Sequence, residues 1–148
     1  IFMAISKLIS HRGNISGPDI SNENHPTYIE KAINLGFDCE VDIWVVNKEL
    51  FLGHDEPMYK TTVDFLSNYV KYLWIHCKNF ESLEYLNKIG EHNYFWHQQD
   101  RFTITSKGYI WTYPGNIVGN NSVIVDNEKK VSDYECFGVC SDYVEIYR

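Results

Sequence analysis

Residues 37–46 read Phe37-Asp38-Cys39-Glu40-Val41-Asp42-Ile43-Trp44-Val45-Val46, and apolar and acidic side chains alternate strictly from Phe37 to Ile43. This period of two predicts a β-strand, because successive side chains of a strand point to opposite faces of its sheet. The acidic residues Asp38, Glu40 and Asp42 therefore share one face. The other face carries the apolar side chains of Phe37, Cys39, Val41 and Ile43.

Helices and further strands are expected around this strand in regular alternation. Apolar periodicity and turn residues predict a strand over Ile5–Ser10, a helix over Thr27–Leu35, the strand Phe37–Val46, a short strand at Leu50–Leu52, a helix over Thr62–Val70, a strand over Tyr72–Cys77, a helix over Glu81–Ile89 and a strand over Tyr94–His97. Strands separated by helices are typical of parallel sheets.

Helical patterns fade beyond Gly90. The remaining apolar segments all look extended and are joined by short connectors: Phe102–Thr105, Tyr109–Tyr113, Val123–Val125 and Gly138–Ile146. The chain of 148 residues contains no linker-like or repetitive stretch, so we expect a single domain over residues 1–148.

Composition excludes several classes of partner. Lys and Arg number 13 and Asp and Glu 20, which gives a net charge of −7 with neutral histidines. An acidic chain has little reason to hold nucleic acid by neutralising phosphates, and no basic cluster favours a membrane surface. No apolar run approaches the ~20 residues of a membrane-spanning helix.

The cysteines indicate a reducing compartment. Cys39, Cys77, Cys136 and Cys140 form no Cys-x-x-Cys pair, and a chain of this length needs no disulfide scaffold, so we expect buried free thiols. The first ten residues also lack the basic segment and the cleavage site of a secretory signal. Together these features predict a cytoplasmic protein.

Glu40 and Asp42 are candidates for a metal site. They lie two residues apart on one strand, so their carboxylates lie side by side. Adjacent carboxylates repel each other unless a positive charge lies between them, and Mg²⁺ or Ca²⁺ suits such oxygen ligands. A solvated acidic face of an antiparallel strand is the alternative interpretation.

Other polar groups follow the first predicted strands. His11-Arg12-Gly13 ends the first one, Gly53-His54-Asp55 follows the short strand, and His76 and Lys78 lie two apart at the end of a later one. Two histidines permit one general base and one general acid, while Arg and Lys can hold phosphate. Each pattern alone also fits an ordinary turn or surface. In a parallel barrel, however, such strand ends converge on one mouth.

Three motifs follow one another along the chain: His11-Arg12-Gly13, Gly36–Asp42 and Gly53-His54-Asp55. In this order and spacing they resemble the glycerophosphodiester phosphodiesterase family. That family belongs with the phosphatidylinositol-phospholipase-C-like phosphodiesterases. The similarity is dense over residues 5–56, continues through Lys78 and reappears in Cys136–Val144. The resemblance implies an α/β fold, the TIM barrel. Because a TIM barrel rarely has fewer than about 200 residues, we expect a reduced TIM-like (β/α) barrel with several helices missing in the second half.

The resemblance also implies roles for individual residues. His11 and His54 match the two catalytic histidines, one a general base and the other a general acid. Arg12 would hold a phosphate oxygen, and Lys78 matches a lysine that helps to neutralise the phosphate. Trp111 resembles a tryptophan at the substrate mouth. His97 matches no motif, and we expect it to be structural.

The implied metal ligands depart from the family pattern at one position. Glu40 and Asp42 match the metal-binding carboxylates, whereas His76 replaces the usual third carboxylate. Mg²⁺ or Ca²⁺ is the expected divalent ion. Imidazole nevertheless suits transition metals better than Ca²⁺, which leaves the identity of the metal open.

The candidate residues and the resemblance together predict that the chain is a metal-dependent phosphodiesterase. It would be a phosphoric diester hydrolase in lipid metabolism. Its substrate would be a small glycerophosphodiester-type or lysophospholipid-type molecule. The nucleophile is either water, giving hydrolysis, or a hydroxyl of the substrate, giving a cyclic phosphate. Two alternatives stay open: a catalytically weak barrel that binds a phosphate ligand, and an interaction domain with a solvated acidic face. Either the aromatic surplus of the chain, 16% of its residues, or a homo-oligomer would cover the trimmed second half.

Overall fold

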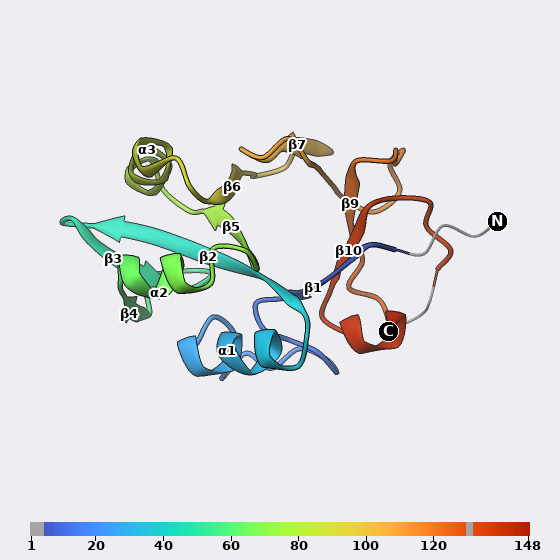
Figure 1. Cartoon of the computed structure of the whole chain (residues 1–148), viewed down its shortest axis with the longest axis horizontal. Coiled ribbons are helices and arrows are strands. Elements are labelled where there is room, and N and C mark those ends of the chain that lie inside the picture. Colours follow the sequence, from blue (N-terminus) through green and yellow to red (C-terminus); the bar gives the residue numbers. More distant parts are fainter. Residues whose placement is uncertain (1–4, 130–131) are drawn as a thin grey trace.

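A computed structural model describes residues 5–129 and 132–148. Its centre is a curled, mixed sheet of ten strands (Figure 1). In chain order the strands are β1 (Lys7–His11), β2 (Asp38–Val46), β3 (Glu49–Leu52), β4 (Tyr59–Thr61), β5 (Leu73–Cys77), β6 (Asn93–Trp96), β7 (Phe102–Ile104), β8 (Ile110–Thr112), β9 (Ser122–Val125) and β10 (Gly138–Ser141). The helices are α1 (Pro26–Asn34), α2 (Val63–Asn68), α3 (Phe80–Ile89) and the 3₁₀ helix η1 (Val144–Tyr147).

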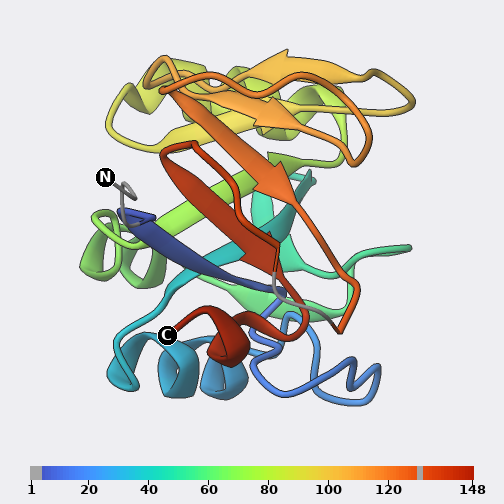
Figure 2. The same ribbon diagram turned by 90° about the vertical axis from the view of Figure 1, so that its right-hand side faces the viewer.

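The long strand β2 organises the sheet because it pairs with three other strands. Its first residues run parallel to β1, its middle runs parallel to β5, and its end forms an antiparallel hairpin with β3. Beyond β1 the sheet continues through β10, β9 and β8, all parallel, and β7 closes this side antiparallel to β8. Figure 2 shows β1, β10 and β9 side by side.

The expected reduced TIM-like barrel is wrong. The described residues form a curled half-barrel in which α-helices follow strands only in the first half (Figure 1). Antiparallel hairpins interrupt the parallel order at both ends of the sheet path. The connectors supply the physical reason. A parallel crossover needs a dozen or more residues, and residues 105–109 leave room only for a hairpin between β7 and β8.

Most individual elements of the first half agree with the sequence. The three expected helices correspond to α1, α2 and α3 within one or two residues. The short strand β4 escaped the sequence analysis. The strand expected over Gly138–Ile146 ends at Ser141, and its remainder contains the 3₁₀ helix η1. No helix among the described residues combines the length and the apolar character that crossing a membrane requires.

The alternation in β2 separates two packing environments. Its apolar face joins the core beneath the helices, together with Ile29 of α1, Leu66 of α2 and Leu86 of α3. Its acidic face turns into the curl of the sheet, where a second core contains Trp74, Phe95 and Trp111. The strand therefore places its carboxylates in a largely apolar interior.

One side chain couples α3 to β2. Asn79 caps α3, because its Oδ1 accepts from the backbone N–H of Ser82 at 3.1 Å. The same amide bonds to the backbone of Val45, accepting from its N–H at 3.3 Å and donating to its C=O at 2.9 Å. Asn79 therefore satisfies backbone groups of both a helix start and a strand end.

Replacing Asn79 by Ala should destabilise the protein by about 2 kcal/mol, since the helix loses its cap and the buried Val45 loses both partners. The measurement is urea unfolding followed by circular dichroism. Asn68→Ala serves as the control, because Asn68 is exposed at the end of α2. Equal unfolding midpoints for the two variants would contradict this role of Asn79.

Candidate functional site

A pocket of about 620 Å³ lies where the strands β1 and β5 end, beside the part of β2 that runs parallel to both. Carboxyl ends of parallel strands meet at one edge of a sheet, which brings together residues far apart in the chain. Six of the seven candidate residues line this pocket: His11, Arg12, Glu40, His54, His76 and Lys78. The seventh, Asp42, is buried directly beside it and contacts His76 and Arg12. The structure thus brings all seven together.

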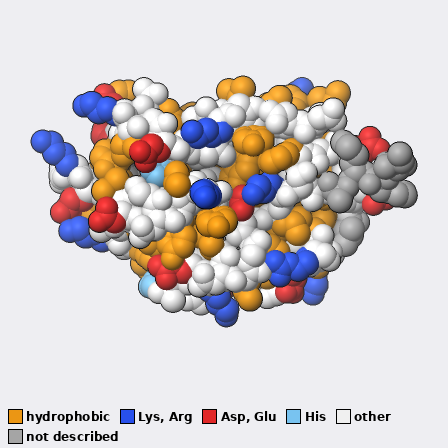
Figure 3. Space-filling view, viewed as in Figure 1, with side chains coloured by type: hydrophobic (Ala, Val, Ile, Leu, Met, Phe, Trp, Pro, Cys, Tyr) orange, Lys and Arg blue, Asp and Glu red, His pale blue; other side chains and the backbone are white. Residues whose placement is uncertain are grey.

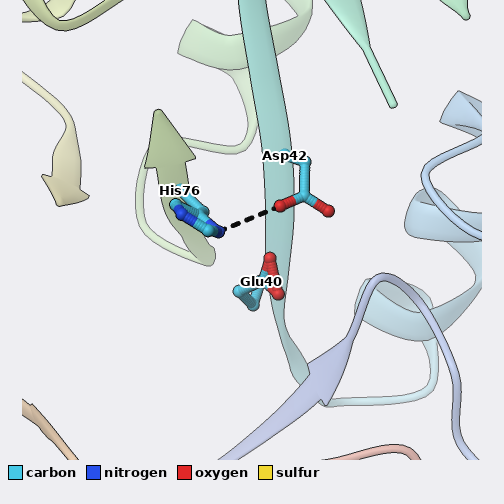
Figure 4. Close-up of side chains that lie close together, drawn as sticks. All are labelled: Glu40, Asp42 and His76. Atoms are coloured by element: carbon cyan, nitrogen blue, oxygen red, sulfur yellow. Dashed lines mark ion pairs between the residues drawn. The ribbon is translucent and has the colours of Figure 1, made fainter. Parts of the chain in front are cut away.

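Glu40, Asp42 and His76 form a compact group of potential metal ligands (Figure 4). Asp42 of β2 pairs in register with His76 of β5, and one ligand atom from each of the three residues lies within 4.8 Å of the others. His76 Nδ1 lies 3.1 Å from Asp42 Oδ1. Two carboxylates and one imidazole give an O, O, N donor set that suits a divalent cation.

The carboxylates of this group are buried. Glu40 is 3% exposed and Asp42 1% exposed, so the interpretation as a solvated acidic face is wrong. Among the described residues Glu40 Oε1 has no hydrogen-bond partner, and Asp42 Oδ1 has the ion-pair contact with His76 Nδ1 in place of one. Burial and the neighbouring Asp42 raise the pKa of Glu40. Burial would also raise the pKa of Asp42, but His54, His76 and Arg12 together lower it below its usual range. A buried oxygen such as Glu40 Oε1 fits a bound cation.

The tautomer of His76 strengthens the case for a cation. Its Nε2 lies 3.1 Å from the backbone carbonyl of His97, which can only accept, so Nε2 carries a proton. In a neutral ring Nδ1 would then direct a lone pair at the carboxylate of Asp42. That arrangement is repulsive unless a proton or a metal ion lies between the two groups.

Asn24 holds Asp42 in place and was missed by the sequence analysis. It adopts a left-handed backbone (φ 66°), and its side-chain Nδ2 donates to Asp42 Oδ2 while its Oδ1 accepts from the Asp42 N–H, both at 2.9 Å. The preceding Glu23 pairs with Arg12 at 3.0 Å. Arg12 Nε also lies 3.4 Å from Asp42 Oδ2. Arg12 therefore serves as a fixed counter-charge to the acids of the site as well as lining the pocket.

His54 reaches the site through the turn after β3. Gly53 donates its N–H to the carbonyl of Asp42 and accepts from the Trp44 indole at 2.7 Å. A Cβ at Gly53 would lie 2.1 Å from a backbone oxygen of Glu56, so only glycine fits. His54 Nδ1 then lies 3.5 Å from Asp42, and Arg12 donates to Nε2 at 3.2 Å. The same Nε2 lies 3.5 Å from Oδ1 of the exposed Asp55.

His11 is oriented by Asp142, another residue that the sequence analysis missed. His11 Nδ1 donates to Asp142 Oδ1 at 2.7 Å, and Asn14 donates to the same oxygen at 2.9 Å. His11 Nε2 lies 3.5 Å from Glu40. Burial would lower the pKa of His11, but the hydrogen bond to Asp142 and the charge of Glu40 together raise it. This pairing favours the protonated ring.

Aromatic residues form another wall of the pocket. His97, expected to be structural, lines the pocket and stacks on Tyr113 with ring centroids 3.8 Å apart. Trp111 lines the same pocket, as its resemblance to a mouth tryptophan implied. The sequence does mark His97 in one way, because it directly follows β6. The end of β6 lies at the same edge of the sheet as the other site residues.

Comparisons with protein-family models, with curated proteins and with solved structures give no match. The resemblance to the glycerophosphodiester phosphodiesterases therefore rests on the quoted motifs, and the chemistry is argued from the geometry of this chain.

Glu40→Gln should stabilise the metal-free protein at pH 7 and raise its Tm by a few degrees. A carboxyl whose pKa is raised by folding binds its proton more tightly in the folded chain. The contribution of Glu40 to the free energy of unfolding of the wild type therefore rises as pH falls from neutral toward the ordinary glutamate pKa of about 4.3. The difference in Tm between Glu40→Gln and the wild type shrinks over the same range. Thermal melts in chelator from pH 7 to 5 test this, with the exposed Glu84→Gln as control. A constant difference across that range would be evidence against it.

Proposed function

We propose that this chain is a metal-dependent phosphodiesterase. The observation that carries the proposal is the buried group of Glu40, Asp42 and His76, which lies at or beside a pocket that His11 and His54 also line. His11 contacts Glu40 and His54 contacts Asp42, so both imidazoles adjoin the ligand group. A metal flanked by two rings that transfer protons fits the cleavage of a phosphodiester.

The metal would be held by Glu40, Asp42 and His76. Their donor set fits Mg²⁺ and Mn²⁺, and the imidazole makes Ca²⁺ the weaker fit. When bound, the ion would act as a Lewis acid on a phosphodiester oxygen. Lys78 lines the pocket and forms no ion pair among the described residues, so its ammonium group is available to a phosphate oxygen.

The two histidines differ in their polar contacts, which supports a division of labour. His54, which contacts Asp42 and Arg12, is the candidate base, which would take the proton of the attacking hydroxyl as the new P–O bond forms. His11, whose pKa is raised by the hydrogen bond to Asp142 and the charge of Glu40, suits the acid, which would give its proton to the leaving alkoxide as the old P–O bond breaks. The attacking hydroxyl belongs to water in hydrolysis or to the substrate in cyclisation, and phosphorus NMR of the products distinguishes the two.

The proposal extends to substrate and setting. A pocket of about 620 Å³ fits a small phosphodiester of the glycerophosphodiester or lysophospholipid type. All four cysteines are buried and free, which supports a reducing, cytoplasmic setting. Exposed apolar side chains on β7 and β8 support an oligomer that covers this thinly protected half: Phe102, Ile104 and Ile110.

His11→Ala and His54→Ala should each lower kcat for a chromogenic phosphodiester by about 10²–10⁴-fold, since each removes one proton-transfer group. Assays with Mg²⁺, Mn²⁺ and Ca²⁺ check this, with His25→Ala as control, because His25 caps α1 outside the pocket. Equal and negligible turnover in the wild type and in all variants, also with natural glycerophosphodiesters, would contradict the proposed enzymatic activity. Metal-dependent phosphate binding in calorimetry would then favour the binding module.

Asp142→Asn tests the orientation of His11. We expect kcat to fall on the order of 10²-fold. Without the carboxylate the pKa of His11 falls, so an acid at this position deprotonates earlier and the alkaline limb of the pH–rate profile moves to lower pH. The exposed Asp133→Asn is the control. A lower kcat with an unmoved alkaline limb would reduce Asp142 to a structural role.

A further inference from the structure

A second pocket, of about 360 Å³, lies at the opposite end of the sheet. Several of its lining residues begin a strand: Lys7 in β1, Asp38 in β2, Leu73 in β5 and Asn93 in β6. The candidate metal site lies where the same strands end. Because a strand rises about 3.3 Å per residue, Lys7 and His11 at the two ends of β1 are about 13 Å apart. The two pockets are therefore separate.

The second pocket concentrates positive charge on an acidic chain. Lys7, Lys71 and Lys107 line it, and Asp38 is the one acidic residue among its lining residues. Lys7 Nζ lies 3.5 Å from Asp38 Oδ2, whereas Lys71 and Lys107 form no ion pair within the described ranges. Figure 3 shows basic side chains gathered around apolar ones near the middle of this face. With a net charge of −7 overall, this local excess of cations attracts anions.

Hydrogen bonds and ring packing hold the floor of this pocket in place. Asp38 is buried, and its Oδ2 accepts from the indole Nε1 of Trp74 at 3.0 Å. It thereby anchors both Lys7 and Trp74. The ring of Trp74 packs against Tyr109 at 5.0 Å, and Tyr109 stacks on Phe137 at 4.6 Å. The pocket thus joins a cationic rim to an aromatic wall held in a fixed position.

We propose that this pocket binds a small soluble organic phosphate, with the phosphate group among Lys7, Lys71 and Lys107 and the organic part against Trp74 and Tyr109. Ammonium groups act as point charges for phosphate oxygens, and a pair of lysines without carboxylate partners leaves charge for an incoming dianion. The volume matches a small-molecule site. The aromatic wall favours a ligand that carries a planar ring over inorganic phosphate.

Titration calorimetry with adenosine monophosphate and with inorganic phosphate, both at low salt, tests the site. We expect saturable binding of the nucleotide, weaker binding of inorganic phosphate, and at least a tenfold loss of nucleotide affinity in Lys71→Gln/Lys107→Gln. Both lysines are exposed, so the double variant should fold normally, as circular dichroism will verify. The control is Lys88→Gln, an exposed lysine of α3 that does not line this pocket.

Several outcomes would overturn this site. One is that adenosine monophosphate shows no saturable binding. Another is that Lys88→Gln loses as much nucleotide affinity as the double variant. A third is that inorganic phosphate binds as tightly as the nucleotide. A loss caused by Lys78→Gln instead of the double variant would place the anion in the pocket at the strand ends. The inference does not depend on the proposed phosphodiesterase, because His11→Ala should bind the nucleotide as well as the wild type does.

Discussion

Two buried carboxylates on one face of β2 impose the constraint around which the rest of the site is arranged. Glu40 and Asp42 lie inside the curl of the sheet, where unpaired charge is costly. Each neighbouring element supplies a compensating group. The turn after β1 brings Arg12, the loop before α1 brings Asn24, and β5 brings His76. Even so, within the described ranges Glu40 Oε1 keeps no hydrogen-bond partner, and Asp42 Oδ1 has its ion-pair contact with His76 in place of one. The surroundings thus offset part of the cost of burying the two carboxylates.

The same strand also explains why a chain of 148 residues can combine a core and a site. Alternation along β2 sends Cys39, Val41 and Ile43 into the core beneath the helices and the acids into the curl. Its nine residues are enough to pair with β1, β5 and β3 in succession. A one-residue slip in register would exchange the two faces, so packing of the apolar face fixes the position of the carboxylates.

How much of this could be predicted from the sequence depends on the range of the interactions. The period of two in residues 37–46 and the helical spacing of the first half are local, and they led to the right elements and to all seven residues around the pocket. The architecture of the second half depends on connector lengths and distant pairings, so the barrel expectation failed. Asp142 meets His11 across 131 positions, and Asn24 lies in a polar loop whose left-handed backbone has no periodic signature.

The geometry at His76 suggests how the fold tolerates the carboxylates without a metal. Its Nε2 is committed to the carbonyl of His97, so Nδ1 faces Asp42 with either a proton or a lone pair. The 3.1 Å contact between Nδ1 and Asp42 Oδ1 gives this carboxylate a polar neighbour inside the fold. A metal ion that binds to Nδ1 must displace any proton on it, because only the unprotonated nitrogen is a ligand. A divalent cation at this position would therefore replace the direct contact between Nδ1 and Asp42, and the carbonyl of His97 already orients the ring for that role.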